Sequence, residues 1–144
     1  MKKTLVIFAT ILLMAGSAWG ADYYAAVSDV GAGNCTVGNE CDLAQAIAAA
    51  TSAGDTVHLL AGTYTTQIAP AASGSDGSPI TFQIKAGEAE YSAIISTSSI
   101  GALLDGDDWI VIDGLYFNNT GSHWIQLKNQ ADYNIIQNCK FYDA

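Results

Sequence analysis

Acidic residues gather in one short stretch of the second half of the chain. Asp105, Asp107 and Asp108 lie within four positions, and Asp113 follows five positions later. Carboxylate oxygens are preferred calcium ligands, and a cation beside a uronate carboxylate would assist β-elimination of an acidic polysaccharide. The spacing differs from that of a calcium-binding loop, and the alternative is a polar turn at a corner of the fold. Asp105, Asp107 and Asp108 are therefore the candidate metal site.

Lysines and aromatic residues supply the other candidate chemistry. Lys128 and Lys140 are candidates for a base or for a contact to a sugar carboxylate, with solvated surface lysine as the alternative. Tyr116 and Trp124 offer ring faces on which a sugar can stack, whereas packing between strands is the alternative. These four residues are the candidate sugar contacts, and both interpretations of each stay open at this stage.

The two histidines give no catalytic assignment. His58 alternates with Val57 and Leu59, so it is expected to point away from a core and into solvent. His123 precedes Trp124 without a recognisable nucleophile or second ligand nearby in the sequence. No residue of the chain is therefore predicted to be catalytic.

An internal repeat indicates what positions these residues. The stretch 110–117 recurs at 134–141, which is a shift of 24 positions. The matched pairs are Ile112 with Ile136, Phe117 with Phe141, Trp109 with Tyr133, Tyr116 with Lys140, Leu115 with Cys139 and Leu103 with Leu127. Alternating apolar residues broken by Asp113-Gly114 or Gln137-Asn138 are typical of short strands joined by tight corners. Such a unit buries its apolar row only by stacking on a copy of itself, which predicts a parallel β-solenoid.

An earlier stretch extends the same pattern. A shift of 25 positions places Val57 on Phe82 and Leu59 on Ile84, with 70–79 as a loop by composition. In these coils Trp109 and Tyr133 should stack on each other, as should Phe117 and Phe141. Cys139 is expected to be a small buried hydrophobic residue.

The N-terminal third has three distinct parts. A short basic start, an apolar run and small residues before Ala21 predict a secretory signal peptide over 1–20. A strand is expected within 21–30, and Cys35 and Cys41 are expected to form a disulfide. The capping-box spacing of Asp42 and Gln45 predicts an amphipathic helix that ends at Gly54 and covers the first coil. The expected organisation is thus a signal peptide (1–20), a cap (21–54) and coils (55–144).

The charge composition of the chain restricts the classes of binding partner that we expect. The chain has 14 acidic residues against five lysines and no arginine, for a net charge of −9. This balance argues against nucleic acid, whose binding depends on many contacts between basic side chains and phosphate. It also argues against direct binding of a polyanionic sugar unless a cation such as calcium bridges the carboxylates. After signal cleavage no membrane span is expected, and the location is secreted, periplasmic or at the cell surface.

The order of these signals resembles a known family. The helix and strand of CDLAQAIAAATSAGDTVHLLAGTY, then SGSDGSPITFQI, WIVIDGLYF and NIIQNCKFYDA, are similar to the N-terminal part of secreted right-handed parallel β-helix proteins. Within that pectate-lyase-like superfamily, the nearest likeness is to the chondroitinase B and alginate lyase type. The resemblance covers most of 35–144 and its motifs are structural.

The resemblance implies an all-β, right-handed parallel β-helix, a solenoid with about 24 residues per coil, behind an N-terminal helical cap. It further implies a carbohydrate-active protein, lyase-like or glycan-binding, for which calcium is a candidate cofactor. A non-enzymatic cell-surface or adhesion solenoid is the alternative, because the same coils build both classes. The fourth coil stops in mid-turn, so we expect a truncated chain whose catalytic coils lie beyond Ala144.

Overall fold

The computed structural model describes residues 19–27, 33–118 and 120–142, and it consists mostly of short strands with one helix. Residues 1–18 of the predicted signal peptide lie outside the described residues. The elements are β1 (Asp22–Ala25), α1 (Leu43–Ala49), β2 (Thr56–Leu59), β3 (Gly62–Tyr64), β4 (Ile80–Ile84), β5 (Ala93–Ile95), β6 (Ile100–Asp105), β7 (Ile110–Asp113), β8 (Tyr116–Asn118), β9 (His123–Lys128), β10 (Ile135–Gln137) and β11 (Lys140–Tyr142).

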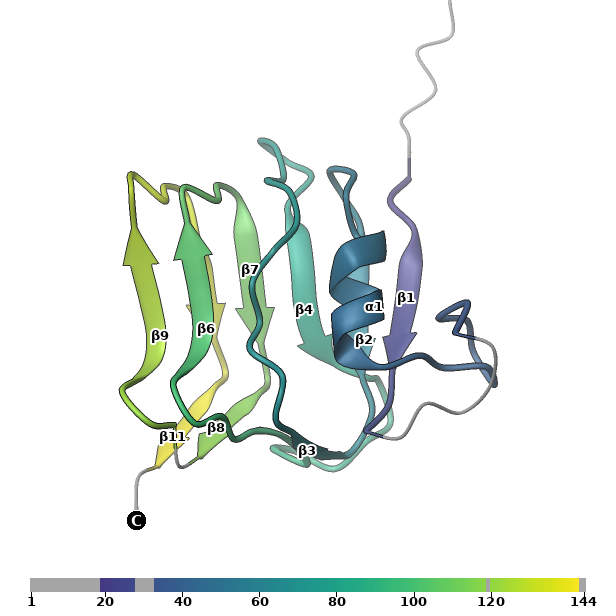
Figure 1. The fold of residues 1–144 in the computed structure, drawn as a ribbon. Coiled ribbons are helices and arrows are strands. Elements are labelled where there is room, and N and C mark those ends of the chain that lie inside the picture. Colours follow the sequence, from purple (N-terminus) through teal and green to yellow (C-terminus); the bar gives the residue numbers. More distant parts are fainter. Residues whose placement is uncertain (1–18, 28–32, 119, 143–144) are drawn as a thin grey trace, which may run out of the picture.

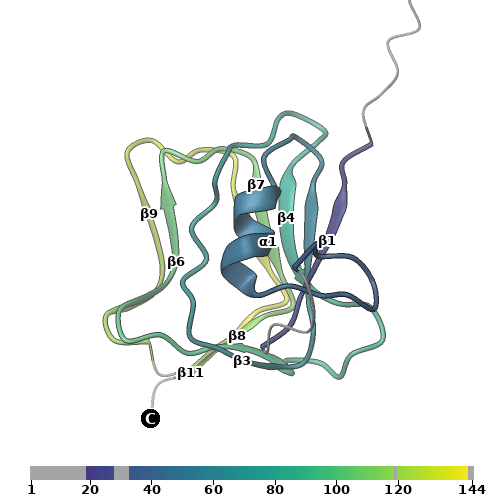
Figure 2. The same ribbon diagram turned by 45° about the vertical axis from the view of Figure 1, so that its right-hand side comes forward.

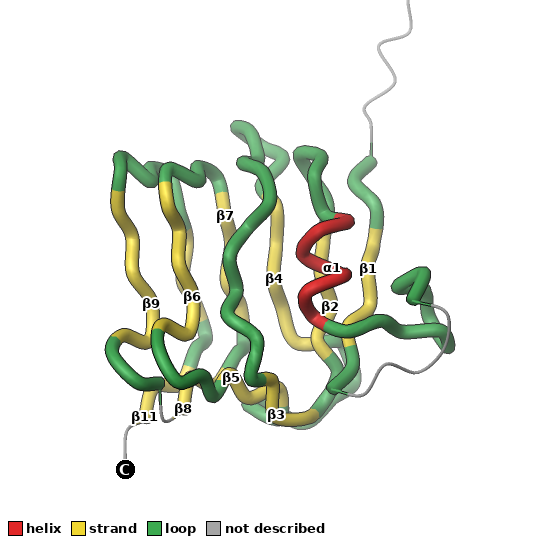
Figure 3. Tube along the Cα trace, in the orientation of Figure 1, coloured by secondary structure: helices red, strands yellow, loops and turns green. Residues whose placement is uncertain are grey.

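The strands form three parallel sheets. Sheet A has the order β1-β2-β4-β7-β10, sheet C has the order β11-β8-β5-β3, and sheet D pairs β6 with β9. From β4 onward the chain visits sheets A, C and D in turn, so each strand lies beside the strand of the turn before (Figures 1 and 3). The exception is β6, whose partner in the preceding turn is the isolated bridge at Ile68. Seen from the second angle, the three sheets surround a common interior (Figure 2).

The strand register contains two of the residue pairs expected from the shift of 24 positions. Ile136 pairs with Ile112 in sheet A, and Phe141 pairs with Phe117 in sheet C. The expected shift of 25 positions is also present, because Phe82 pairs with Val57. The predicted period is not uniform, however, since Ile110 pairs with Ile80, which lies 30 positions earlier.

The irregular period has a local cause. Eight residues, 85–92, join β4 to β5, whereas two residues, 60–61, join β2 to β3, and two, 114–115, join β7 to β8. Across this loop the shift between paired residues falls from 30 positions, for Ile80 and Ile110, to 22 positions, for Ile94 and Tyr116. The next two corners bring the shift to 23 and then to 24 positions. Residues 85–92 form a loop outside the sheets, so the strands keep their alignment while the turn becomes longer.

One predicted pairing is wrong by a single residue. Leu127 pairs with Leu104 and not with Leu103, whose partner is Gln126. Measured between paired residues, the corner after β9 is one residue longer: six residues separate Lys128 from Ile135, whereas five separate Asp105 from Val111. Asn129 and Gln130 both adopt positive φ there, at 53° and 60°, where the earlier corner uses a single glycine, Gly106.

The helix begins as predicted and ends earlier. Asp42 accepts a hydrogen bond from the Gln45 backbone while the Gln45 side chain accepts one from the Asp42 backbone, which completes the capping box. The predicted end at Gly54 is wrong, because α1 ends at Ala49. The chain must turn there to enter β2, and the carboxylate of Asp55 stabilises the turn by accepting hydrogen bonds from the backbone N–H groups of Ala21 and Ser52.

A single apolar core fills the space between the sheets and α1. Its largest fully buried side chains are Phe82, Phe117, Leu43, Leu59, Ile68, Ile80, Ile95, Leu104, Ile110, Ile112, Leu115 and Val57. Fully burying a side chain of this size contributes roughly 1.5–3 kcal/mol before entropy costs. The inward positions of the repeat therefore supply most of the stability that holds the outer faces in place.

The structure shows the state of the three cysteines and whether any described helix could cross a membrane. Cys35 and Cys41 form the predicted disulfide. Cys139 is half-buried and packs against the core, where burial raises the pKa of its thiol. Within the part of the chain that the structure describes, no helix has the length and apolar character needed to cross a bilayer.

Candidate functional site

A polar row crosses the outer face of sheet A. The parallel register places one residue of each strand in line, and together we call them the polar row: Tyr24, His58, Gln83, Asp113 and Gln137. Each member alternates with inward residues such as Val57 and Phe82 and therefore faces outward. Neighbouring strands lie about 4.8 Å apart, so five strands give a row roughly 20 Å long.

His58 is held on three sides within the row. Its Nε2 atom lies 2.8 Å from Oδ1 of Asp22, and its ring stacks on Tyr24 at a centroid distance of 4.8 Å. Because a carboxylate can only accept, the neutral imidazole carries its proton on Nε2, and Nδ1 accepts from the Gln83 amide at 3.3 Å. Both ring nitrogens are engaged, so His58 orients neighbours and is not a free base. The predicted outward direction is correct, but the side chain is only 14% exposed.

Asp113 organises the other end of the row. Its carboxylate accepts hydrogen bonds from the amides of Gln137, at 2.9 Å, and Asn138, at 2.8 Å. Gly114 and Asn138 both have positive φ, which confirms the predicted tight corner. A cavity of about 300 Å³ adjoins Asp113 and is lined by Ile84, Glu90, Tyr91, Asp113, Gly114 and Asn138. The row therefore leads into a hollow that contains two carboxylates and one aromatic ring.

The polar row has the donor and acceptor chemistry of a sugar-binding surface. It combines amides, an imidazole, a carboxylate and a phenol, and such groups exchange hydrogen bonds with hydroxyls at orientations fixed by the sheet. The stacked ring of Tyr24 provides an apolar face at one end. The row contains no lysine, and its carboxylate disfavours a bare polyanion. A hydroxyl-rich neutral ligand fits these groups directly, whereas a uronate would need a cation between the carboxylates.

The three predicted calcium ligands each have a different neighbour. Oδ2 of Asp105 lies 3.0 Å from Nζ of Lys128, and hydrogen bonding by Lys128 and Asn129 holds the pKa of Asp105 below its usual value. Asp107 accepts from the backbone of Asp105, and burial raises its pKa. Asp108 accepts from the backbone of Asp132 at 2.7 Å.

These contacts match the alternative interpretation of a polar corner. Over residues 19–27, 33–118 and 120–142, no group of three or more His, Cys, Asp or Glu side chains is arranged as metal ligands would be. Calcium binding by Asp105, Asp107 and Asp108 stays a prediction, which a calcium titration followed by NMR would test.

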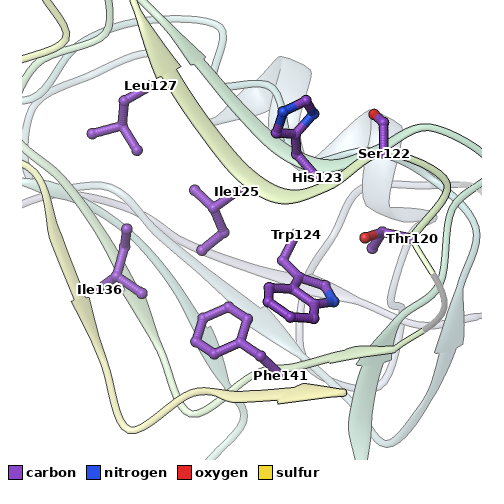
Figure 4. A pocket seen from close by; sticks show the side chains of 8 residues that line it. All are labelled: Thr120, Ser122, His123, Trp124, Ile125, Leu127, Ile136 and Phe141. Carbon is purple, nitrogen blue, oxygen red and sulfur yellow. The ribbon is translucent and has the colours of Figure 1, made fainter. Parts of the chain in front are cut away.

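The four predicted sugar contacts separate into three places. Tyr116 and Lys140 lie together on the outer face of sheet C, with Nζ 4.5 Å from the ring centroid. Trp124 instead lies against Phe141, at a centroid distance of 5.6 Å, beside the interior (Figure 4). Lys128 is paired with Asp105, a partner that the spacing of the repeat does not indicate. Only the first pair forms an outward aromatic and cationic surface.

Sequence reasoning missed the polar row as a unit. The shift of 25 positions already placed His58 on Gln83, and the shift of 24 placed Asp113 on Gln137. The shift of 30 between β4 and β7 was not recognised, so the two pairs were not joined. Asp22 and Tyr24 lie in a strand without a recognisable copy, and only the structure brings them beside His58.

Comparison with family models, with curated proteins and with solved structures finds no match to this chain.

Proposed function

We propose that this chain is an exported right-handed parallel β-helix protein of the pectate-lyase-like kind, and that it binds polysaccharide along the polar row. The fold part is supported by three parallel sheets that the chain visits in a repeated order, with like residues in register. The resemblance of the sequence to secreted polysaccharide lyases supports the choice of ligand class. Export is supported by the basic and apolar start of the sequence and by the disulfide between Cys35 and Cys41.

The observation that carries the proposal is the continuous outward line from Tyr24 to Gln137. A linear polymer lying across the strands would meet a hydrogen-bonding group at every strand spacing, about 4.8 Å apart. The groups are held before binding, because His58 contacts Asp22 and Gln83, and Asp113 contacts Gln137. Ordering these side chains in advance reduces the entropy cost of binding.

The test is a titration with soluble polysaccharide fragments, followed by NMR and calorimetry. Neutral glucan, mannan and xylan fragments are compared with pectate, alginate and chondroitin fragments, each with calcium and with EDTA. Chemical shift changes are expected along the polar row, and the variant Gln83→Ala should weaken binding by about tenfold through loss of one or two hydrogen bonds. Absence of binding to every fragment would refute the proposal.

Two control variants locate the binding face. Thr63→Ala changes an exposed residue on the outer face of sheet C and should leave affinity unchanged. Lys140→Ala removes the cation above Tyr116 on that same sheet. A loss of affinity with Lys140→Ala but not with Gln83→Ala would assign the ligand to sheet C and would overturn the assignment to the polar row.

A further assay separates an enzyme from a binding protein. β-Elimination of pectate, alginate or chondroitin produces an unsaturated product that absorbs in the ultraviolet, so a rise in absorbance reports lyase activity. One observation favours the second candidate, a non-enzymatic glycan-binding or adhesion protein. Lys128, one of the two lysines considered as a base, is paired with Asp105. His58 was not assigned a catalytic role, and both of its ring nitrogens are engaged. Binding without an absorbance rise would support that candidate.

A further inference from the structure

A buried carboxylate lies in the turn that leads into β2. Asp55 is only 2% exposed. In the described part of the chain, the carboxylates that pair with lysine or histidine are those of Asp22, Glu88 and Asp105. None of these described pairs includes Asp55. Removing a carboxylate from water is costly unless hydrogen bonds or a cation compensate for the loss. The partners of this carboxylate therefore need an explanation.

Both carboxylate oxygens of Asp55 accept hydrogen bonds from backbone nitrogens. Oδ1 accepts from the nitrogen of Ala21 at 2.8 Å, and Oδ2 accepts from the nitrogen of Ser52 at 2.9 Å. Ser52 lies in the same turn as Asp55, whereas Ala21 lies 34 positions earlier in the sequence. The contact with Ala21 is therefore made by the fold and not by local spacing.

The sheet register holds the Ala21 nitrogen at this carboxylate. β1 pairs with β2 so that Asp22 lies opposite Thr56, and the Thr56 nitrogen donates to the carbonyl oxygen of Ala21 at 2.8 Å. Ala21 is thus held through its own N–H and through its own C=O. β1 is the outermost strand of sheet A, on the side of the molecule where α1 lies (Figure 1). Because the strand pairing fixes Ala21, its nitrogen stays beside Asp55 whether it belongs to an amide or to an amine.

Ala21 is also the residue before which the sequence predicts cleavage of the signal peptide. Signal peptidases require a small residue directly before the cleaved bond, and Gly20 meets this requirement. The fold requires the same glycine, because an added Cβ at Gly20 would overlap the backbone of Gly54. The Gly20–Ala21 bond thus lies where cleavage is expected and where the fold brings the Ala21 nitrogen to a buried carboxylate.

We propose that Asp55 is the binding site for the α-ammonium group that cleavage before Ala21 creates, so that processing strengthens the attachment of β1 to β2. The proposal rests on the proposed export of the chain. Hydrolysis adds the hydroxyl of one water molecule to the Gly20 carbonyl carbon and the other hydrogen to the Ala21 nitrogen. The new carboxyl group of Gly20 then releases a proton and the new amine takes one up, because an α-amino group has an ordinary pKa of about 7.7–8.0.

The ammonium group strengthens a contact that the amide already makes. A hydrogen bond between two charged groups is roughly twice as strong as one between neutral groups. Burial of Asp55 keeps most water away from the pair, so the attraction is weakly screened. The ammonium also supplies a cation to a carboxylate that has none among the described ion pairs. The processed chain is therefore expected to be more stable than the same chain with its α-amino group blocked.

The first experiment establishes where the processed chain begins. The full sequence is expressed with export in a bacterial host, and the intact mass of the purified protein is measured. A mass that corresponds to residues 21–144 is expected. Cleavage at another bond would overturn the proposed site and leave export standing, whereas retention of residues 1–20 would overturn both.

The second experiment measures the effect of the charge. The α-amino group of the processed chain is acetylated at mildly acidic pH, where the lysines stay protonated, and peptide mapping verifies the position of the acetyl group. Acetylation keeps an N–H at Ala21 and removes its charge, and the acetyl group takes the place that Gly20 occupies before cleavage. The folding equilibrium constant from urea unfolding should fall about tenfold. An unchanged constant in a chain of the expected mass would overturn the proposed pairing and leave export standing.

Two variants assign the effect to one carboxylate. Asp55→Asn removes the charged partner, so acetylation of this variant should change the folding constant by about twofold or less. Asp22→Asn is the matched control, because Asp22 is the carboxylate next to Ala21 in the sequence and its side chain is 62% exposed. Acetylation of Asp22→Asn should still cause the full loss. If Asp55→Asn does not fold, wild type and Asp22→Asn decide, since disappearance of the loss in Asp22→Asn would assign the ammonium to Asp22 and overturn the proposal.

Discussion

Trp109 and Tyr133 stack face to face across consecutive turns, with ring centroids 4.4 Å apart and an interplanar angle of 7°. Both residues have a left-handed backbone, with φ of 56° and 57°. This conformation costs a residue with a side chain roughly 1–2 kcal/mol, and only glycine adopts it freely. The stacked rings therefore offset a backbone cost that the corner imposes on each turn.

The stack predicts an unusual order of stability for substitutions at Tyr133. Tyr133→Ala removes the ring but keeps the backbone cost, so it should lower the free energy of unfolding by about 1–2 kcal/mol. Tyr133→Gly removes the ring and also relieves the backbone, so it should be about 0.5–1 kcal/mol more stable than the alanine variant. Urea unfolding of the two variants measures the difference. A glycine variant that is less stable than the alanine variant would contradict the strain argument.

A buried phenol predicts an alkaline limit to stability. The hydroxyl of Tyr64 lies 2.8 Å from the carbonyl oxygens of Ala25 and Leu60, and burial raises its pKa well above the ordinary value of 10.0. Because the folded-state pKa is raised, this contribution is fully present below about pH 10 and is lost as the pH rises further. Tyr64→Phe should cost about 1 kcal/mol at pH 7 and flatten the decline above pH 10.

The measurement is thermal unfolding from pH 7 to pH 11. Tyr142→Phe is the control, because Tyr142 is half exposed at the surface and its replacement should leave the alkaline decline as it is in the wild type. An unchanged decline in Tyr64→Phe would show that another group causes it.

Much of the fold could be predicted from the sequence, because strands that stack in register have similar residues at a regular spacing. A parallel register puts Ile136 on Ile112 and Phe141 on Phe117, so the same residue types recur at the spacing of one turn. The capping box of α1 was equally visible, since it depends on two side chains three positions apart. Features that arise from local spacing or from direct repetition could therefore be predicted from the sequence.

The polar row and the corner after β9 were harder to predict from the sequence, because stacking in space does not require a constant spacing in the sequence. Loop 85–92 lengthens one turn without disturbing the sheets, so the alignment in space survives while the alignment in sequence does not. The additional residue between β9 and β10 moved the partner of Leu127 by one position and brought Lys128 beside Asp105. A loop outside the sheets can gain residues at little cost in free energy. The added residues change the sequence spacing between paired strands, so the pairing cannot be recognised from a constant repeat length.

The contact between Lys128 and Asp105 predicts a measurable change in titration. Lys128 and Asn129 hold the pKa of Asp105 below its usual value by hydrogen bonding. Lys128→Met should therefore raise the pKa of Asp105, as followed by carboxyl carbon shifts in NMR. Because the folded-state pKa is lowered, the contribution to stability is present above the unfolded pKa and is lost as the pH falls. Lys140→Met is the control and should leave the Asp105 titration unchanged.

The disulfide predicts a dependence of stability on reduction. Cys35 and Cys41 close a short ring, and the backbone of Cys41 hydrogen-bonds to Tyr24 and Ala26 of the first strand region. The chain-entropy model gives about 2 kcal/mol for a ring of this length. Replacing both cysteines by serine should lower the free energy of unfolding by about that amount. Cys139→Ser is the control, because it removes the free cysteine and keeps the disulfide. The loss of unfolding free energy when this variant is reduced measures the contribution of the disulfide alone.

The stacked core makes the sharpest prediction, because two adjacent residues of one strand have opposite environments. Ile112 is fully buried between Phe82 and Ile136 at one inward register position, whereas Val111 is half-buried on the outer face. Ile112→Ala leaves a cavity between three turns and should cost about 3–4 kcal/mol, whereas Val111→Ala should cost less than about 1 kcal/mol. Urea unfolding monitored by circular dichroism gives both values. Similar costs for the two variants would mean that the inward row does not hold the turns together, and the position of the polar row on the outer face of sheet A would lose its support.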